Sequence, residues 1–180
     1  MRWDDVESTF LAMSDEERPL AMRWQSPRGG TLLHIALMKY APPLLLSLMI
    51  ARTSTKYLDV VTLRDDGDDA PLHTAAHFCP SLHDVWHLIS IYPGGLLACN
   101  YSGETSLAVN RALSTNPDCV ALLESATTAM QEYDFEGLCE AIDKLGMASP
   151  ALINLEESWR RVIEFKERII ELEERFGVAA

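Results

Sequence analysis

Apolar residues in the middle of the chain follow a helical pattern that occurs three times. Segments 30–36, 70–76 and 103–109 align on one leucine each, and these leucines are Leu33, Leu72 and Leu107. Thirteen and sixteen residues after each leucine the chain is apolar again, first at Leu46, Val85 and Val120, then at Met49, Leu88 and Leu123. A short helix, a connection and a second apolar helix give this spacing. The pattern therefore predicts three successive helix-turn-helix units.

Residues that start helices stand at matching places between the two predicted helices of each unit. The connections contain Pro42-Pro43, Cys79-Pro80-Ser81 and Asn116-Pro117. Proline suits the first turn of a helix because the N–H that it lacks would be unpaired there, and Ser and Asn are favoured caps. These residues support the same division into units.

The openings of the three units resemble the ankyrin repeat, a helix-turn-helix unit with the signature Gly-x-Thr-Pro-Leu-His-x-Ala. The three stretches begin at Gly30, Ala70 and Gly103, and each departs from the signature, for example at Leu32, Ala70 and Ala108. The resemblance covers about residues 25 to 130. It implies that thin units, none of which buries its apolar face alone, stack into one continuous core.

The expected fold class is all-α: a short ankyrin-repeat solenoid of helix-turn-helix units with a C-terminal helical hairpin including one long helix. An N-terminal helical cap is expected over 1–24, because Trp3, Val6, Phe10 and Met13 share one helical face. The three ankyrin-like repeats are placed at about 25–62, 63–98 and 99–130. The C-terminal helical hairpin extension is placed at 131–180.

The C-terminal extension predicts a short helix over 135–145 and a long helix from about residue 149 to 176. Two interpretations of the long helix stay open. Either it packs on the last repeat as a cap, or its distal half pairs with another helix in an assembly. The residues available for that assembly contact are Phe165, Ile169, Leu172 and Phe176.

Charge and apolar run length narrow the classes of partner. The chain has 180 residues, 27 of them acidic and 15 basic, which gives a net charge of −12. Without a basic patch this charge disfavours nucleic acid as a partner. The N-terminal residues resemble neither a secretory signal nor a transit peptide. The most apolar stretch, 44–51, is far shorter than the roughly 20 residues of a membrane span, so none is expected.

Four cysteines occur without a CxxC pair, at Cys79, Cys99, Cys119 and Cys139. Free and mostly buried thiols in a reducing intracellular compartment, cytoplasmic or nuclear, are the interpretation that this pattern favours.

Candidate chemistry is limited to histidines and one acidic loop. His73 and His77 are four residues apart, as are His83 and His87, and this spacing can hold zinc on a helix. The resemblance, however, gives His73 a structural role. The loop 65–69 lacks the glutamate twelve positions on that a calcium loop needs, since Ala76 stands there. No phosphate loop or nucleophile elbow is present, so we expect neither catalysis nor a cofactor or metal.

The resemblance implies a concave binding surface made of the loop tips and the ends of the first helices. The function expected from it is a non-enzymatic protein-protein interaction module or scaffold, whose partner has a basic surface because the central tip is acidic. The alternative is a structural subunit held mainly through the C-terminal helices. The residues expected to bind the partner are Met38, Lys39, Asp65, Asp66, Asp68, Asp69, His77, Phe78, Tyr101, Glu104, Ala112 and Leu113.

Overall fold

The computed structural model describes residues 2–53, 59–113, 116–132, 134–145 and 160, and these residues form helices and connections without a strand. The all-α class is therefore confirmed. The elements are α1 (Trp3–Ala12), α2 (Glu17–Arg23), α3 (Leu32–Met38), α4 (Pro43–Thr53), α5 (Asp59–Thr62), α6 (Pro71–Phe78), α7 (Leu82–Ile91), η1 (Pro93–Leu96), α8 (Ser106–Leu113), α9 (Pro117–Glu132) and α10 (Phe135–Lys144).

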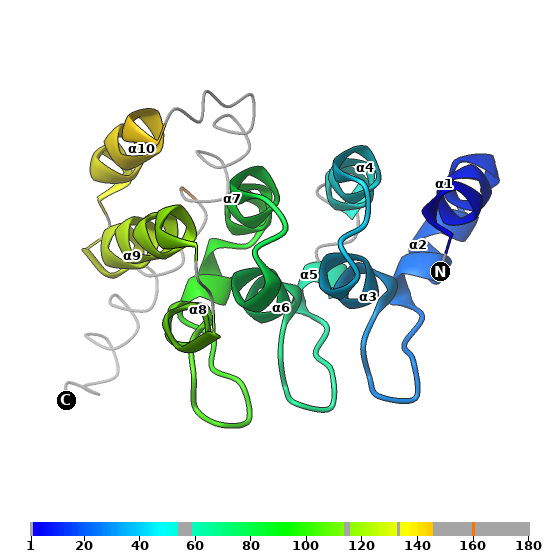
Figure 1. Ribbon diagram of the computed structural model, residues 1–180, viewed down its shortest axis with the longest axis horizontal. Coiled ribbons are helices and arrows are strands. Elements are labelled where there is room, and N and C mark those ends of the chain that lie inside the picture. Colours follow the sequence, from blue (N-terminus) through cyan, green and yellow to red (C-terminus); the bar gives the residue numbers. More distant parts are fainter. Residues whose placement is uncertain (1, 54–58, 114–115, 133, 146–159, 161–180) are drawn as a thin grey trace, which may run out of the picture.

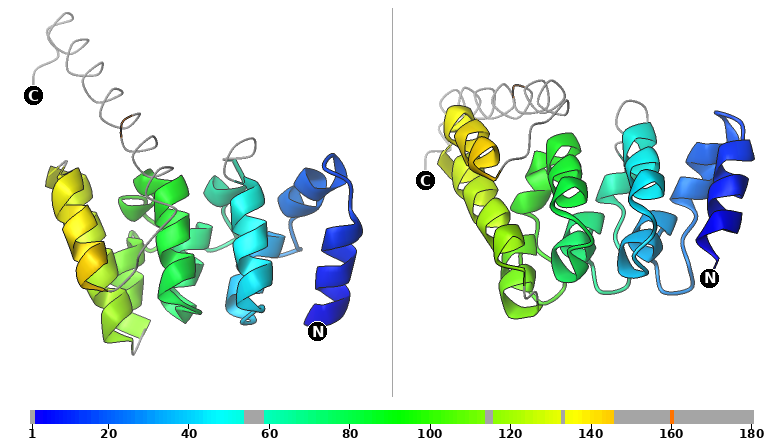
Figure 2. Two further views of the ribbon diagram at one scale, coloured as in Figure 1. Left: turned by 90° about the horizontal axis from the view of Figure 1, so that it is seen from above. Right: turned by 45° about the horizontal axis from the view of Figure 1, so that its top comes forward.

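The helices lie in two rows (Figure 1). One row contains α3, α6 and α8, and the second contains α1, α4, α7 and α9, with α10 packed on α9. Within the first row α6 contacts both neighbours, and each first helix also contacts the second helix that follows it. Figure 2 shows the second row from above as helices lying side by side. The hairpin loops that precede α3, α6 and α8 all project away from the second row.

The three marker leucines occupy equivalent places. Leu33, Leu72 and Leu107 are each the second residue of a first helix, in α3, α6 and α8. Leu33 and Leu72 are buried, whereas Leu107 is half-buried because α8 ends the row. The three residues sixteen positions on are fully buried or nearly so, and they are Met49, Leu88 and Leu123.

The helix starts follow the sequence signals. The Thr31 hydroxyl caps α3 by accepting the His34 N–H, and Pro71 is the first residue of α6. The Ser81 hydroxyl accepts the Asp84 N–H at the start of α7. The Asn116 side-chain carbonyl accepts the Cys119 N–H at the start of α9. Each cap pairs an N–H that the helix itself leaves unpaired.

Two buried histidines join consecutive units. The Nδ1 of His34 accepts the Thr31 N–H at 3.2 Å, and its Nε2 lies 2.9 Å from the carbonyl oxygen of Asp69 in the next hairpin. His73 repeats this arrangement with the Ala70 N–H at 3.2 Å. A backbone N–H can only donate, so Nδ1 is the acceptor and Nε2 carries the proton that it donates across the units. Both rings are therefore neutral.

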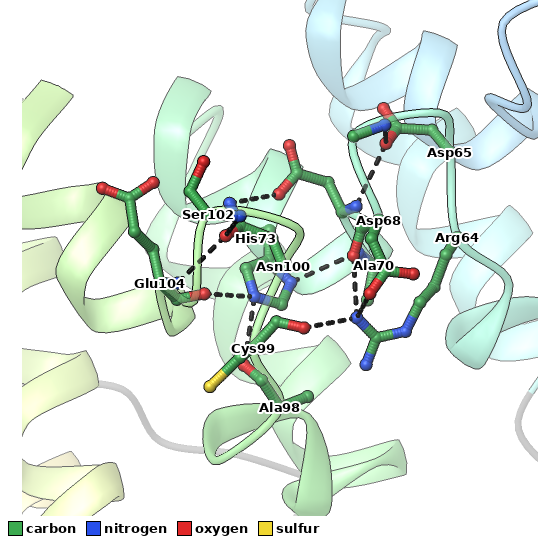
Figure 3. Close-up of polar contacts among 12 residues, drawn as sticks. Arg64, Asp65, Asp68, Ala70, His73, Ala98, Cys99, Asn100, Ser102 and Glu104 are labelled. Atoms are coloured by element: carbon green, nitrogen blue, oxygen red, sulfur yellow. Dashed lines mark hydrogen bonds and ion pairs between the residues drawn. The ribbon is translucent and has the colours of Figure 1, made fainter.

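The reach of His73 is wider than that of His34. Its Nε2 lies 3.1 Å from the carbonyl oxygen of Ala98 and 3.2 Å from that of Glu104, which are the two sides of the third hairpin (Figure 3). One ring thus holds the start of α6 and both arms of the following hairpin.

No helix in the part of the chain that the structure describes is both long enough and apolar enough to cross a membrane.

We expect acid to weaken the fold through these two rings. Burial lowers the pKa of both His34 and His73 from the ordinary value of 6.5. The unfolded chain therefore binds more protons below about pH 6.5, so the stability from neutral rings is present above that pH and is lost as the pH falls through the lowered values. Thermal unfolding followed by circular dichroism should show Tm falling between pH 7.5 and 5.5.

The variant His73→Gln should be less stable at neutral pH by about 1–3 kcal/mol, because buried backbone groups lose their partner. Its Tm should also change less with pH. His83→Gln, at an exposed position on α7, is the matched control. An equal pH dependence in His73→Gln and the unmodified chain would contradict the role of this ring.

We also expect Ala70→Thr to stabilise the protein by about 1 kcal/mol. Ala70 precedes α6 with φ −78° and ψ 162°, close to the −74° and 171° of the capping residue Thr31, but it has no side-chain oxygen. Thr31→Ala should cost a similar amount. Chemical denaturation of both variants measures the two changes, and a loss of stability in Ala70→Thr would show that the buried site cannot hold the hydroxyl.

Candidate functional site

The three hairpins have the same backbone geometry. In the first, the Ser26 N–H bonds to the Gly30 carbonyl at 2.9 Å, and the same bond recurs between Asp65 and Asp69 and between Asn100 and Glu104. The fourth residue of each hairpin has a positive φ: Gly29 at 71°, Asp68 at 60° and Gly103 at 77°. The three tips are therefore a regular array with one backbone conformation.

Backbone bonds join the tips to one another. The Asp66 N–H bonds to the Arg28 carbonyl at 3.1 Å, and the Tyr101 N–H bonds to the Gly67 carbonyl at 3.0 Å. A Cβ at Gly29 would lie 2.9 Å from the Asp66 nitrogen, so glycine is needed there for close approach as well as for its φ. The tips are held by main-chain contacts that do not depend on the tip side chains.

Side chains at the base of each hairpin repeat the link between units. Gln25 donates to the carbonyl of Gly29 in its own hairpin and to that of Arg64 at the base of the next. Arg64, at the equivalent position, donates to the Asp68 carbonyl at 2.7 Å and to the Cys99 carbonyl at 2.6 Å (Figure 3). The second and third hairpins are thus each completed by a donor from the unit before them.

Three of the four aspartates in the central tip are used inside the hairpins. Asp65 accepts the N–H groups of Gly67 and Asp69, as the first residue of an Asx turn does. Asp68 pairs with Arg64 at 3.1 Å, and Asp69 accepts the side-chain amide of Asn100 at 3.0 Å. Asp66 is exposed, while the other three are half-buried. Partner binding by all four aspartates stays a prediction.

The C-terminal ends of the first helices carry a row of exposed apolar side chains. Met38 is 39% exposed at the end of α3, and Leu113 is 56% exposed at the end of α8. Lys39, His77 and Ala112 are exposed beside them, as the sequence predicted. We call Met38, Tyr40, His77, Phe78 and Leu113 the helix-end row.

Phe78 differs from its prediction as an exposed anchor, because neighbouring rings cover part of it. His77 stacks on Phe78 with the ring centroids 4.2 Å apart. Tyr40 meets Phe78 edge-on, at 6.2 Å and nearly a right angle. Phe78 is therefore half-buried, and Tyr40 presents the larger exposed surface at 61%. A ring from the end of α3 and a ring from α6 thus make one aromatic contact between two units.

Tyr40 is the site residue that the sequence interpretation missed. It follows α3 with a φ of 51°, and the Ala41 N–H bonds back to the Ala36 carbonyl at 2.9 Å. This is the hydrogen-bond pattern of a helix end that ordinarily contains glycine, and a tyrosine there costs about 1–2 kcal/mol. The signal in the sequence is an aromatic residue just beyond the helix, where a glycine is common.

Tyr101 and Glu104 lie in the third hairpin. The Tyr101 side chain is 87% exposed at the tip, although its backbone is bonded to the second tip. The Glu104 side chain is half-exposed and extends away from the hairpin network (Figure 3). Together with Asp66 of the second hairpin, they are polar residues of the hairpins that reach the surface. We call them the tip residues.

Two titratable groups of α7 have shifted pKa values. The His83 and His87 rings are 5.8 Å apart, and burial, with a smaller effect of His83, lowers the pKa of His87. Asp84 is buried at the start of α7, where burial raises its pKa and a hydrogen bond from the Ser81 hydroxyl opposes that shift. Among the described residues no group of three His, Cys, Asp or Glu is placed to hold a metal ion.

An open groove of about 550 Å³ lies between α8 and α9. Its lining includes Leu97, Leu107, Thr127 and the ion pair of Arg111 with Glu124 at 2.7 Å. The predicted long C-terminal helix and its contact residues Phe165, Ile169, Leu172 and Phe176 lie outside the described residues.

We expect glycine to be more stable than alanine at position 40. Both changes remove the ring, but only glycine adopts the positive φ freely. The free energy of unfolding of Tyr40→Gly should therefore be about 1 kcal/mol higher than that of Tyr40→Ala. The control is Thr128, an exposed residue of α9. There the alanine variant should be more stable than the glycine variant by a similar amount. Urea unfolding of the four variants gives both differences, and the same order at both positions would show that residue 40 is not held in that conformation.

Comparison with protein-family models, curated proteins and solved structures gives no match to this chain. Its function is therefore argued from the surface described above.

Proposed function

We propose that the protein is a non-enzymatic interaction module of the ankyrin type, which binds a segment of another protein across the helix-end row and the tip residues. Three observations support the ankyrin arrangement. The units recur at 39 and 35 residues, the hairpins share one conformation, and each unit donates hydrogen bonds to the hairpin of the next. Units of this kind form extended surfaces that suit an elongated ligand.

The observation that carries the proposal is Tyr40, whose backbone is strained and whose ring is exposed. An exposed side chain at this helix end contributes little to the core, yet the chain keeps a tyrosine where glycine would relieve the backbone. Backbone strain of this kind gathers at sites where a side chain has a task. Large rings that lie on a fixed backbone and remain exposed are the side chains that most often dominate protein interfaces.

The rigidity of the surface favours binding without a large entropy cost. The His34 and His73 rings fix the hairpins relative to the first helices, and bonds between the tips fix them relative to one another. A surface ordered before binding loses little conformational freedom when the partner docks.

The partner segment should combine apolar and basic residues. Apolar side chains match Met38, Tyr40 and Leu113, while Asp66 and Glu104 are the acidic groups of the surface that remain for contact with the partner. The net charge of −12 additionally favours the approach of a basic segment and mainly increases the association rate. Lys39 beside the row would oppose a basic group near the helix ends, so the basic residues belong opposite the tips.

The test is a selection of random linear peptides on the immobilised full chain, followed by affinity measurements with variants. Tyr40→Gly and Tyr101→Ser should each weaken the selected peptides about tenfold, which corresponds to about 1.4 kcal/mol. The control is Leu20→Ser, which removes an equally exposed apolar side chain, 69% exposed, from α2 outside the row.

Tyr40→Gly is informative because it relieves backbone strain, so weaker binding would not reflect an unfolded surface. Selected peptides should be enriched in Lys or Arg beside aromatic or aliphatic residues, and their affinity should fall as salt rises. A selection without any peptide whose affinity depends on Tyr40 or Tyr101 would overturn the proposal. Binding lost only on truncation after Lys144 would assign the contact to the C-terminal residues instead.

A further inference from the structure

Two cysteines from different units meet beside the helix-end row. Cys79 ends α6, and Cys119 lies in the first turn of α9. Each thiol shifts the pKa of the other as a side-chain hydrogen-bond partner, so the two side chains lie close together. Cys79 is half-buried and Cys119 is fully buried, so Cys79 is the more accessible residue of the pair. The expectation that the cysteines are mostly buried is thus met by Cys119 alone, since Cys99 is exposed and Cys139 is half-buried.

Two asparagine side chains hold this pair. The Asn116 amide donates to the Cys79 sulfur at 3.5 Å, while its carbonyl accepts the Cys119 N–H at 3.3 Å. The Asn110 amide donates to the Cys119 sulfur at 3.4 Å and to the Ala76 carbonyl in α6 at 2.5 Å. Asn110 stands where the repeat signature has alanine, and Asn116 both caps α9 and touches the sulfur of the preceding unit. Each sulfur therefore accepts a hydrogen bond from a different asparagine amide.

We propose that Cys79 and Cys119 are a redox-active dithiol, in which a hydroperoxide oxidises Cys79 and Cys119 then closes a reversible disulfide between the second and third units. The geometry supplies the three requirements: a partly exposed cysteine, a second cysteine beside it, and fixed amide donors that stabilise negative charge on the first. Cys99 is more exposed, but among the described residues its thiol makes a long contact of 4.0 Å to the Leu97 carbonyl.

The charges around the pair agree with these roles. The hydrogen bond from the Cys119 thiol lowers the pKa of Cys79, and the Asn116 amide adds to this effect, against burial and the carboxylates of Asp118 and Asp84. The same hydrogen bond, together with burial, raises the pKa of Cys119. The lowered pKa of Cys79 makes it the thiol of the pair that loses its proton more readily.

The reaction balances without a cofactor. The Cys79 thiolate attacks one oxygen of hydrogen peroxide, the O–O bond breaks, and Cys79 sulfenic acid and hydroxide form. The sulfur of Cys119 then attacks the sulfenic sulfur, its proton leaves with the hydroxyl as water, and the S–S bond closes. Two electrons pass from the two sulfurs to the peroxide. A dithiol reductant returns both cysteines to thiols by exchange.

Oxidation should cross-link a loop of 40 residues, from Cys79 to Cys119, and thereby raise Tm, because the bond removes conformations from the unfolded chain. The experiment treats the reduced full chain with stoichiometric hydrogen peroxide, blocks the remaining thiols, and maps the peptides by mass spectrometry. The expected product is an intramolecular Cys79–Cys119 disulfide that has lost two hydrogens, forms before Cys99 is oxidised, and is reversed by dithiothreitol.

Variants separate the roles of the two sulfurs and the amide. Cys119→Ser should leave Cys79 as a sulfenic acid that dimedone traps. Asn116→Asp keeps an oxygen to cap α9 but replaces the amide donor with a carboxylate, so oxidation should slow several-fold while the Tm of the reduced protein changes little. Cys99→Ser is the control and should oxidise at the unmodified rate.

Several results would overturn the proposal. They are peroxide oxidation of Cys99 with the pair still reduced, disulfides formed only between chains, and an unchanged oxidation rate in Asn116→Asp. Each is read from the thiol map and does not depend on whether the surface binds a peptide, so this proposal and the proposed function can fail separately.

Discussion

The stack depends on neutral imidazole rings that join one unit to the next. Each ring accepts a hydrogen bond from the start of its own helix and donates one to a hairpin carbonyl of the following unit. One histidine side chain therefore sets the position of a helix start and of a hairpin that lies about one unit further along the chain. A side chain that could only donate, such as lysine, or that carried no proton on the far nitrogen would satisfy only one of these contacts.

Because the links run from one unit to the next, no unit is complete by itself. Gln25 and Arg64 donate to the hairpin after their own, and Asn110 donates back to the preceding first helix. Cooperativity in such an array comes from interfaces between neighbours as much as from the units themselves. The last unit has no histidine at the equivalent position, where Ala108 stands, and α8 has no following first helix among the described residues. The chain of histidine links thus ends where the row of first helices ends.

Much of the fold was predictable from the sequence because its signals are local or periodic. The spacing of Leu33, Leu72 and Leu107 and the residues that cap helices placed the first and second helices to within a few residues. The polar partners were harder to predict. The aspartates of the central tip look like a charged surface in the sequence, but three of them accept hydrogen bonds that the hairpins require. Long-range hydrogen bonds, such as that from Arg64 to the Cys99 carbonyl, produce no periodic pattern in the sequence.

The candidate site was predicted in outline and missed in its most informative residue. The positions of Met38, Lys39 and Leu113 follow from helix length alone, whereas the role of Tyr40 follows from its backbone conformation, which an apolar pattern does not show. Cys79 occupies the same place after α6, also with a positive φ, at 39°. At both helix ends glycine would relieve strain, and at both the chain has a residue with its own contacts: an exposed ring after α3 and a paired thiol after α6.

The backbone strain at two helix ends links the binding surface to the thiol pair. Phe78 directly precedes Cys79, and its ring is held between His77 and Tyr40. Closing a bond from Cys79 to Cys119 would fix the end of α6, and with it the middle of the helix-end row, to the start of α9. Packed interfaces transmit small displacements because they have little free volume. The oxidation state of the Cys79–Cys119 pair would therefore change the spacing of side chains on the outer surface without a contact between the thiols and a ligand.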